Sequence, residues 1–260
     1  MESGQGGMGH GEHQYSGAAS LTVVALAFAL SAIPVHAAAP AVDLSQFHLD
    51  LAVTSDYVVQ GVTRSQGDPS LQGQLGWMND AGWMAGAWLA TINLNPGHGP
   101  TWELDPYVAK RWVLGRDWSA RMDLTRYVLR PSLRNIDYDY TDVRAALSFR
   151  DVVDMAIGWS PDYSGYSGVG VARRQTMITY EASGHLPASR WLAFNAGIGR
   201  RDLQDAFGRS YWYWSAGAEA AVERWSLGVS YIGTSRTASD LFGSEYAGDR
   251  VVATIALKVK

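Results

Sequence analysis

The sequence predicts an all-β fold, an antiparallel up-and-down transmembrane β-barrel of about 12 strands. After residue 40, apolar and polar residues alternate in segments of roughly ten residues, and no sustained helical period is present. Short and long connections alternate between these segments. Many of the 11 Trp and 13 Tyr residues lie near the segment ends, as expected of aromatic residues at two membrane interfaces.

The alternation separates an apolar face from a polar face in each expected strand. Successive strand residues point to opposite sides, so one face can contact lipid while the other faces a polar interior. The two faces also cancel in the average, which explains a mean hydropathy of only -0.11. In the first segment Phe47, Leu49, Leu51 and Val53 share the apolar face, and His48, Asp50, Thr54 and Asp56 share the polar one. The same division recurs in residues 118–125, 142–149, 153–160, 192–199, 225–231 and 251–260.

The connections predict which end of the barrel faces outward. Outer-membrane barrels have short periplasmic turns and longer extracellular loops, and an even number of strands places both termini in the periplasm. Pro106 falls inside an expected strand and cannot donate to the ladder, so it indicates a bulge. The short connections are residues 79–82, 115–117, 150–151, 186–189 and 223–224, and the long ones are 95–101, 131–136, 161–173, 201–210 and 234–250.

Residues 1–37 are expected to form a signal peptide, and residues 38–260 the exported barrel. Residues 21–33 form an apolar run, Pro34 ends it, and Val35-His36-Ala37 offers small residues at the positions of a cleavage site. The run is too short to cross a bilayer comfortably, because a helix needs roughly 20 apolar residues to do so. Residues 1–20 contain no Lys or Arg, which departs from the usual positive start of a signal peptide.

Composition excludes several classes of function. Without cysteine, the chain has no disulfides, no thiolate zinc site and no cysteine nucleophile. The 21 Lys and Arg residues do not outnumber the 25 Asp and Glu residues and form no basic tract, so nucleic acid is not an expected partner. His48, His98 and His185 lie in no catalytic motif, so we expect no enzyme, cofactor or metal site. Three acidic residues near position 140 could hold a cation through oxygen ligands, but a solvated loop face is the favoured interpretation; these are Asp137, Asp139 and Asp142.

Charged and polar residues on the inner face are the candidate functional residues. Because both signs are present, a water-filled lumen would pass small polar solutes or ions with weak selectivity. If these positive and negative residues paired with one another across the lumen, they would instead close it. The candidate lumen-lining residues are Asp50, Asp56, Gln60, Arg121, Asp123, Arg144, Asp154, Glu181 and Glu219.

Several segments, in order along nearly the whole exported chain, resemble the TorF-like family, a group of proteobacterial outer-membrane proteins classed as porins. The most specific are Thr-Ser-Asp-Tyr-Val-Val-Gln-Gly-Val-Thr at 54–63 and Gly-Asp-Pro-Ser-Leu-Gln-Gly at 67–73. The resemblance implies a membrane barrel and no catalytic mechanism; its expected partners are outer-membrane lipid, small polar solutes and the insertion machinery. Gln60 stands where the family usually has Arg, and Lys260 replaces the terminal aromatic residue that insertion machinery commonly reads.

Two other functions fit the sequence. A non-conducting outer-membrane barrel could bind a ligand or partner through extracellular loops, for which the aromatic residues 211–214 and the Leu241-Phe242 pair are candidates. A soluble periplasmic β-sandwich or lipocalin-like binder would instead enclose the apolar faces in its interior.

Overall fold

The structure is a computed structural model that describes residues 46–94, 101–130 and 137–259. The expected signal peptide at residues 1–37, His98 and Lys260 lie outside the described residues. No helix in the described ranges is long and apolar enough to cross a bilayer.

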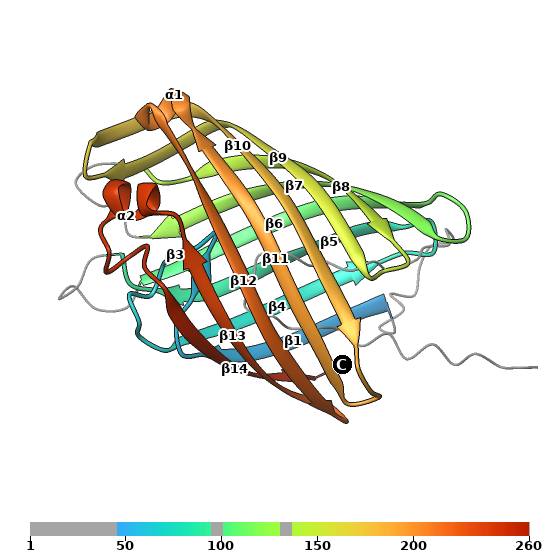
Figure 1. The fold of residues 1–260 in the computed structure, drawn as a ribbon. Helices are drawn as coiled ribbons and strands as arrows, with labels where there is room; N and C mark the ends of the chain where they lie inside the picture. Colours follow the sequence, from blue (N-terminus) through green and yellow to red (C-terminus); the bar gives the residue numbers. More distant parts are fainter. Residues whose placement is uncertain (1–45, 95–100, 131–136, 260) are drawn as a thin grey trace, which may run out of the picture.

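Twelve strands form one closed barrel, as the sequence predicts (Figure 1). All neighbouring strands are antiparallel, and β1 closes the barrel by pairing with β14. The wall strands are β1 (Phe47–Thr54), β4 (Ser70–Met78), β5 (Trp83–Ile92), β6 (Thr101–Val113), β7 (Trp118–Arg130), β8 (Tyr140–Phe149), β9 (Val153–Ser167), β10 (Gly170–Pro187), β11 (Leu192–Leu203), β12 (Arg209–Val222), β13 (Trp225–Thr234) and β14 (Arg250–Lys258).

The apolar face of each strand points outward. In β13, for example, Leu227 is 52% exposed, whereas Ser230 on the opposite face is buried. Several exposed aromatic side chains lie close to the strand ends, such as Trp118 and Trp225 at one end and Trp212 at the other, while Trp159 and Tyr180 are exposed in mid-strand. The sandwich or lipocalin-like alternative is therefore wrong, because it requires these apolar faces to be enclosed.

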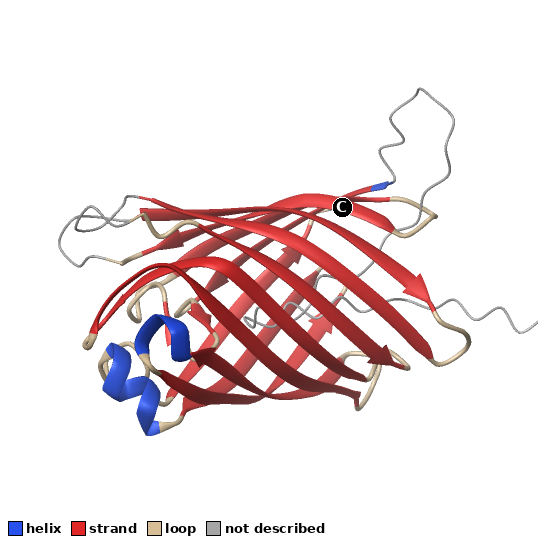
Figure 2. Cartoon of the chain, turned by 90° about the horizontal axis from the view of Figure 1, so that it is seen from above, coloured by secondary structure: helices blue, strands red, loops and turns tan. Residues whose placement is uncertain are grey.

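The two ends of the barrel differ in their connections (Figures 1 and 2). Short turns gather at one end, which we call the turn end; the C-terminus lies there. The other end, which we call the loop end, carries two helices, α1 (Gln204–Phe207) and α2 (Arg236–Phe242). These helices occupy parts of the expected long connections 201–210 and 234–250.

The expected loop at residues 161–173 is wrong. Strands β9 and β10 continue through this segment to a turn at Gly168-Val169, with register shifts between Ala172 and Met177. The Ser- and Gly-rich composition predicted a loop, but the chain continues as strand with an irregular alternation: residues 163–165 are all buried, whereas Tyr166 is exposed. The hairpin therefore rises beyond the rest of the wall at the loop end.

Pro106 produces no bulge. Leu104 pairs with Val128 and Tyr107 pairs with Thr125, so the register between β6 and β7 is the same on both sides of the proline. Pro106 still faces Ala87 of β5. The missing N–H therefore interrupts the ladder toward β7 without shifting it.

The connection between β1 and β4, residues 55–69, folds into the barrel instead of looping away from it. It contains two short strands, β2 (Val58–Val59) and β3 (Val62–Thr63), that pair only with each other. We call residues 55–69 the inward hairpin. The expectation that Asp56 belongs to the first strand is wrong, because β1 ends at Thr54.

The sequence of the inward hairpin explains its turn. Gln60 and Gly61 both have positive φ, 52° and 80°, as a two-residue type I′ turn requires. Glycine adopts this conformation without the steric cost that a Cβ would bring.

Candidate functional site: the lumen and the inward hairpin

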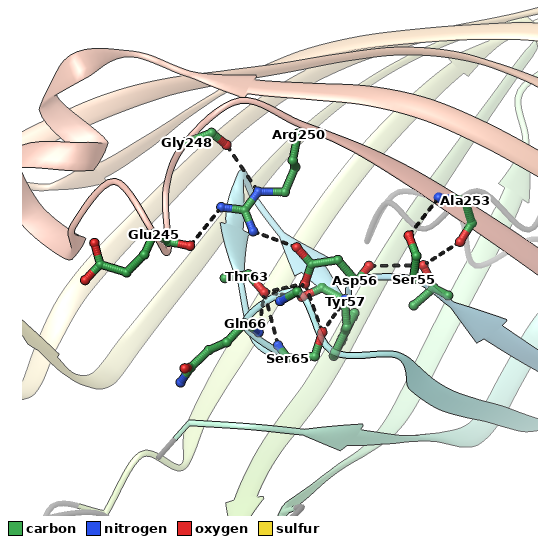
Figure 3. A network of polar contacts seen from close by, with 12 residues as sticks. Ser55, Asp56, Tyr57, Thr63, Ser65, Gln66, Glu245, Gly248, Arg250 and Ala253 are labelled. Carbon is green, nitrogen blue, oxygen red and sulfur yellow. Dashed lines mark hydrogen bonds and ion pairs between the residues drawn. The ribbon is translucent and has the colours of Figure 1, made fainter. Parts of the chain in front are cut away.

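Asp56 organises the base of the inward hairpin (Figure 3). Its Oδ1 accepts hydrogen bonds from the Thr63 hydroxyl, from Ser65 Oγ at 2.9 Å and from the Gly67 amide at 3.2 Å. Its Oδ2 accepts one from Arg250 Nη1 at 2.6 Å. One buried carboxylate thus joins both arms of the hairpin to the start of β14.

Further hydrogen bonds hold the base of the hairpin to the wall and to the loop before β14. Ser55 exchanges two hydrogen bonds with Ala253 of β14, at 2.8 and 3.0 Å. The Thr63 amide donates to the Tyr246 carbonyl at 2.9 Å. Arg250 also donates to the carbonyls of Glu245 and Gly248, both at 3.2 Å, which keeps its guanidinium pointed at Asp56 (Figure 3).

The tip of the hairpin reaches the far wall of the barrel. Tyr211 of β12 donates its hydroxyl proton to the Gln60 carbonyl at 3.1 Å, and Gln60 Nε2 lies 3.4 Å from Thr179 Oγ1 of β10. Four strands, β11 to β14, separate β10 from β1. A Cβ on Gly61 would lie 2.3 Å from Thr234 Cγ2, so this close approach needs glycine as well.

Arg64 connects the hairpin to the wall at strands β6, β7 and β8. It forms an ion pair with the fully buried Glu103 of β6, donates to the Tyr140 hydroxyl of β8 at 3.1 Å, and lies over the Tyr127 ring of β7. Burial works to lower the pKa of Arg64, but the neighbouring Tyr140 and other phenols together with Asp105 outweigh it. The pKa therefore lies above its ordinary value, and Arg64 keeps its charge.

An apolar cluster fills the interior at the level of the hairpin. Tyr57 and Val59 pack there against side chains from the wall strands and from α2, and all members of the cluster are buried. Packing of this kind excludes water as the core of a soluble protein does. The other members are Ala90, Ile92, Leu129, Tyr140, Tyr163, Met177, Leu203, Tyr211 and Tyr213 of the wall, Ala238 and Leu241 of α2, and Ala247 of the loop before β14.

A polar row lies beneath this cluster, toward the turn end. Arg144 of β8 forms an ion pair with Glu181 of β10, and Tyr213 of β12 donates to Glu181 Oε1 at 2.5 Å. Gly158 and Gly199 lie on the strands between them, facing Arg144 and Tyr213 in register. Because these positions carry no side chain, the long polar residues can reach across the intervening strands.

The structure brings together two pairs of the predicted lumen-lining residues. Arg144 meets Glu181 as described, and Arg121 forms an ion pair with Asp123 two residues along β7. Asp50 is buried opposite Lys258 of β14 and takes part in neither pair. The remaining predicted residues lie apart from these pairs: Asp154 near the turn end of β9, Glu219 on β12, and Asp56 and Gln60 on the inward hairpin.

Sequence reasoning missed Arg64 and Glu103, whose ion pair joins the hairpin to β6. It also missed that Tyr213 points into the lumen, where it donates to Glu181. A signal for the hairpin was present: Gln60-Gly61 between Val58-Val59 and Val62-Thr63 is a two-residue turn sequence flanked by strand-forming residues. The pairing of Arg64 with Glu103 had no such signal, because 38 intervening residues hide it and only the closed barrel brings the two together.

The acidic residues near position 140 do not converge on a common point. Asp139 accepts two hydrogen bonds from Arg130, at 2.6 and 3.0 Å, and Asp142 accepts one from Ser160 at 2.8 Å. No group of three potential metal ligands occurs among the residues that the structure describes.

The aromatic residues expected in a binding loop lie in the wall. Tyr211 and Tyr213 of β12 point into the lumen and are buried, while Trp212 and Trp214 point outward. Leu241 belongs to α2 and is buried in the apolar cluster. The assignment of residues 211–214 to a loop is therefore wrong, whereas Leu241 and Phe242 do lie in the connection between β13 and β14.

Comparison with known proteins agrees with this architecture. The chain has 11% sequence identity to the NanC porin, with a TM-score of 0.53, covering 82% of this chain and 99% of that one. It has 6% identity to the KdgM porin, with a TM-score of 0.50 and the same coverage. Identities this low show a shared fold and nothing more.

No curated protein matches the chain. The likeness to porins supports the barrel that the TorF-like resemblance implied, while the TorF-like assignment itself stays a prediction. Residues 37–259 match the family described as "Bacterial protein of unknown function (Gcw_chp)". The chain is a member of this Gcw_chp family, built on a porin-like barrel of twelve strands.

Proposed function

We propose that this chain is an outer-membrane porin through which small polar solutes or ions diffuse passively along a narrow, mixed-charge lumen. The observation that carries the proposal is the division of the wall into an apolar outer face and a polar inner face. Only a barrel that meets lipid outside and water inside needs this division. The lumen-lining residues that we propose are Asp50, Asp56, Gln60, Arg121, Asp123, Arg144, Asp154, Glu181 and Glu219.

The proposed setting is the bacterial outer membrane, reached through a signal peptide at residues 1–37 and with insertion machinery as an assembly partner. The exposed apolar belt would contact lipid, and exposed Trp residues near the strand ends would lie at the two interfaces. Short turns at one end and helices with longer connections at the other support a periplasmic turn end. A TorF-like porin of proteobacteria fits this setting.

The charges support weak selectivity. Arg121 and Arg144 each lie against a carboxylate, so among the described lumen residues these positive charges are balanced locally. Channels that strongly prefer one ion sign are lined by rings of charge of a single sign. We therefore propose small polar solutes of either sign as the substrate class, and we propose no catalytic role.

The proposal is tested by conductance of the purified full-length chain in planar bilayers, together with swelling of liposomes in solutions of small sugars and amino acids. A second chain, in which a Gly-Ser-Gly linker joins Thr54 to Ser70 in place of the inward hairpin, is measured beside it. These two residues already face each other in register, so a short linker can span them. Sealed bilayers and unswollen liposomes with both chains would refute the porin.

A non-conducting barrel is the second candidate, and the apolar cluster around Tyr57 and Val59 favours it. If the interior at the loop end is always packed, no solute crosses while the hairpin is present. If the linker chain conducts and the native chain shows no conductance at any voltage, this candidate is supported over the porin.

A further inference from the structure

We propose that the inward hairpin is a hinged gate at the loop end of the lumen, and that the ion pair between Asp56 and Arg250 is its latch. This inference rests on the proposed porin function, because a gate has meaning only where solutes cross. It specifies which segment controls passage and which contact holds that segment closed.

The attachment of the hairpin permits a hinge. Thr54 and Ser70, the wall residues at its two ends, face each other on the adjacent strands β1 and β4. Both ends of the hairpin therefore leave the wall at one place. The segment can swing toward the loop end without breaking a ladder of the barrel, because β2 and β3 pair only with each other.

The contacts at the tip can separate without rearrangement of the wall. They consist of the Tyr211 hydroxyl on the Gln60 carbonyl, a 3.4 Å contact from Gln60 to Thr179, and the close packing of Gly61. None of these is an ion pair, and Gly61 has no side chain that would clash with the wall as the tip moves. The tip contacts position the hairpin across the lumen, whereas the stronger contacts lie nearer its base.

The latch differs from the other polar contacts of the hairpin in where its partner lies. Arg64 also forms an ion pair, but its partner Glu103 lies near the loop end of β6, which β5, β4 and β1 separate from β14. Arg250 lies beside the hinge, at the start of β14, and its other hydrogen bonds go to the carbonyls of Glu245 and Gly248. The loop before β14 thus holds Asp56 from the loop-end side, which is the side toward which the hairpin would open (Figure 3).

Asp56 is also the acceptor that keeps the hairpin in its folded shape. Thr63, Ser65 and the Gly67 amide all donate to the oxygen of Asp56 that Arg250 does not use. Loss of the Arg250 contact should therefore weaken the hold on the hairpin and leave its folded shape intact, since the internal hydrogen bonds remain. The Arg64–Glu103 pair still has to separate when the hairpin swings. Loss of the Asp56 charge should weaken both the latch and the hairpin itself.

The test is single-channel recording of the full-length chain in planar bilayers, with Arg250→Gln and Asp56→Asn compared with the native protein. We expect the fraction of time in the open state to rise about tenfold in each variant, the effect of a modest shift in a two-state equilibrium. Arg150→Gln is the matched control, because Arg150 pairs with Asp117 at the turn end, far from the hairpin, and its loss should leave the open fraction unchanged.

A reversible cross-link tests the same gate without weakening the fold. The chain has no cysteine, so the double substitution Gln60→Cys and Thr179→Cys supplies the only two thiols. Bridging them with a short bis-methanethiosulfonate reagent should abolish openings, and reducing agent should restore them. This measurement decides the question if either latch variant fails to fold.

The possible outcomes distinguish failure of the gate proposal from failure of the porin proposal. Open fractions of R250Q and D56N equal to that of the native chain would overturn the latch, and openings that persist in the bridged protein would overturn the gate. Either result leaves the porin intact if the linker chain conducts. Absence of conductance in both the native and the linker chain would instead refute the porin, and the gate with it.

Discussion

Glycines on the inner face decide how the large lumen side chains lie. A Cβ on Gly199 would meet the Tyr213 ring at 2.2 Å, and one on Gly86 would meet the Tyr107 hydroxyl at 2.6 Å. Each aromatic side chain therefore lies across the backbone of the neighbouring strand, in space that only glycine leaves open. In this position Tyr213 reaches Glu181 on the strand beyond.

This geometry predicts a large difference between two glycine substitutions. Gly199→Ala should lower the free energy of unfolding by about 1–3 kcal/mol, the usual cost of overpacking a fitted interior. Gly184→Ala is the matched control, because its Cβ would find the nearest atom at 3.8 Å, an ordinary contact. Urea unfolding in lipid vesicles, followed by tryptophan fluorescence, measures both. Equal stability of the two variants would mean that the Tyr213 ring does not need the space over Gly199.

At the level of the elements, period-two alternation made the wall strands predictable. A lipid-facing and a lumen-facing set must alternate along each strand, so the sequence carries the pattern directly; β13 and β14 show it clearly. The same rule misled at Asp56, which continues the alternation of β1 although the chain has already turned inward. The position of the hairpin depends on contacts with β6, β10, β12 and β14, which no local pattern encodes.

The expected loop at residues 161–173 failed for a related reason. Gly and Ser are common in turns, whereas in β9 and β10 they leave room for buried aromatic neighbours. A Cβ on Gly165 would lie 2.6 Å from the Tyr163 hydroxyl. Small residues therefore have two roles in this barrel: some form turns, and others leave space for a neighbouring aromatic ring. Only the closed structure distinguishes the two.

The apolar belt predicts a depth-dependent response along one strand. Ile157 and Val153 share the outer face of β9 and are similarly exposed, 46% and 44%, but Val153 begins the strand at the turn end. Ile157→Arg should reduce stability by about 2–4 kcal/mol and Val153→Arg by about 0–1 kcal/mol, because the cost of a charge in the bilayer falls toward the interface. Reversible unfolding from vesicles gives both values. A cost at Val153 equal to or above that at Ile157 would place the belt elsewhere on the strand.

At the scale of the whole molecule, the two halves of the interior have different physical characters. The loop-end half holds an apolar cluster that joins the inward hairpin, α2 and seven wall strands, β5 and β7 to β12. The half toward the turn end holds the Arg121–Asp123 pair and the buried Asp50. Passage through the barrel would therefore be controlled at the loop end, where the apolar side chains exclude water, and the Arg121–Asp123 pair would line the part of the lumen on the turn-end side of it.

Function at that scale also depends on which end faces outward. Twelve strands bring both ends of the described chain to the turn end, and the β9–β10 hairpin rises farthest at the other end, with its turn at Gly168-Val169. If the loop end is extracellular, an epitope tag inserted after Val169 should bind antibody on intact cells. A tag inserted after Asp151, in the turn between β8 and β9, should bind only after the outer membrane is permeabilised. Both insertions lie in exposed turns outside the ladder, so the barrel should tolerate them equally. Antibody binding to the Asp151 tag alone on intact cells would reverse the orientation, and the hairpin would then control the periplasmic mouth.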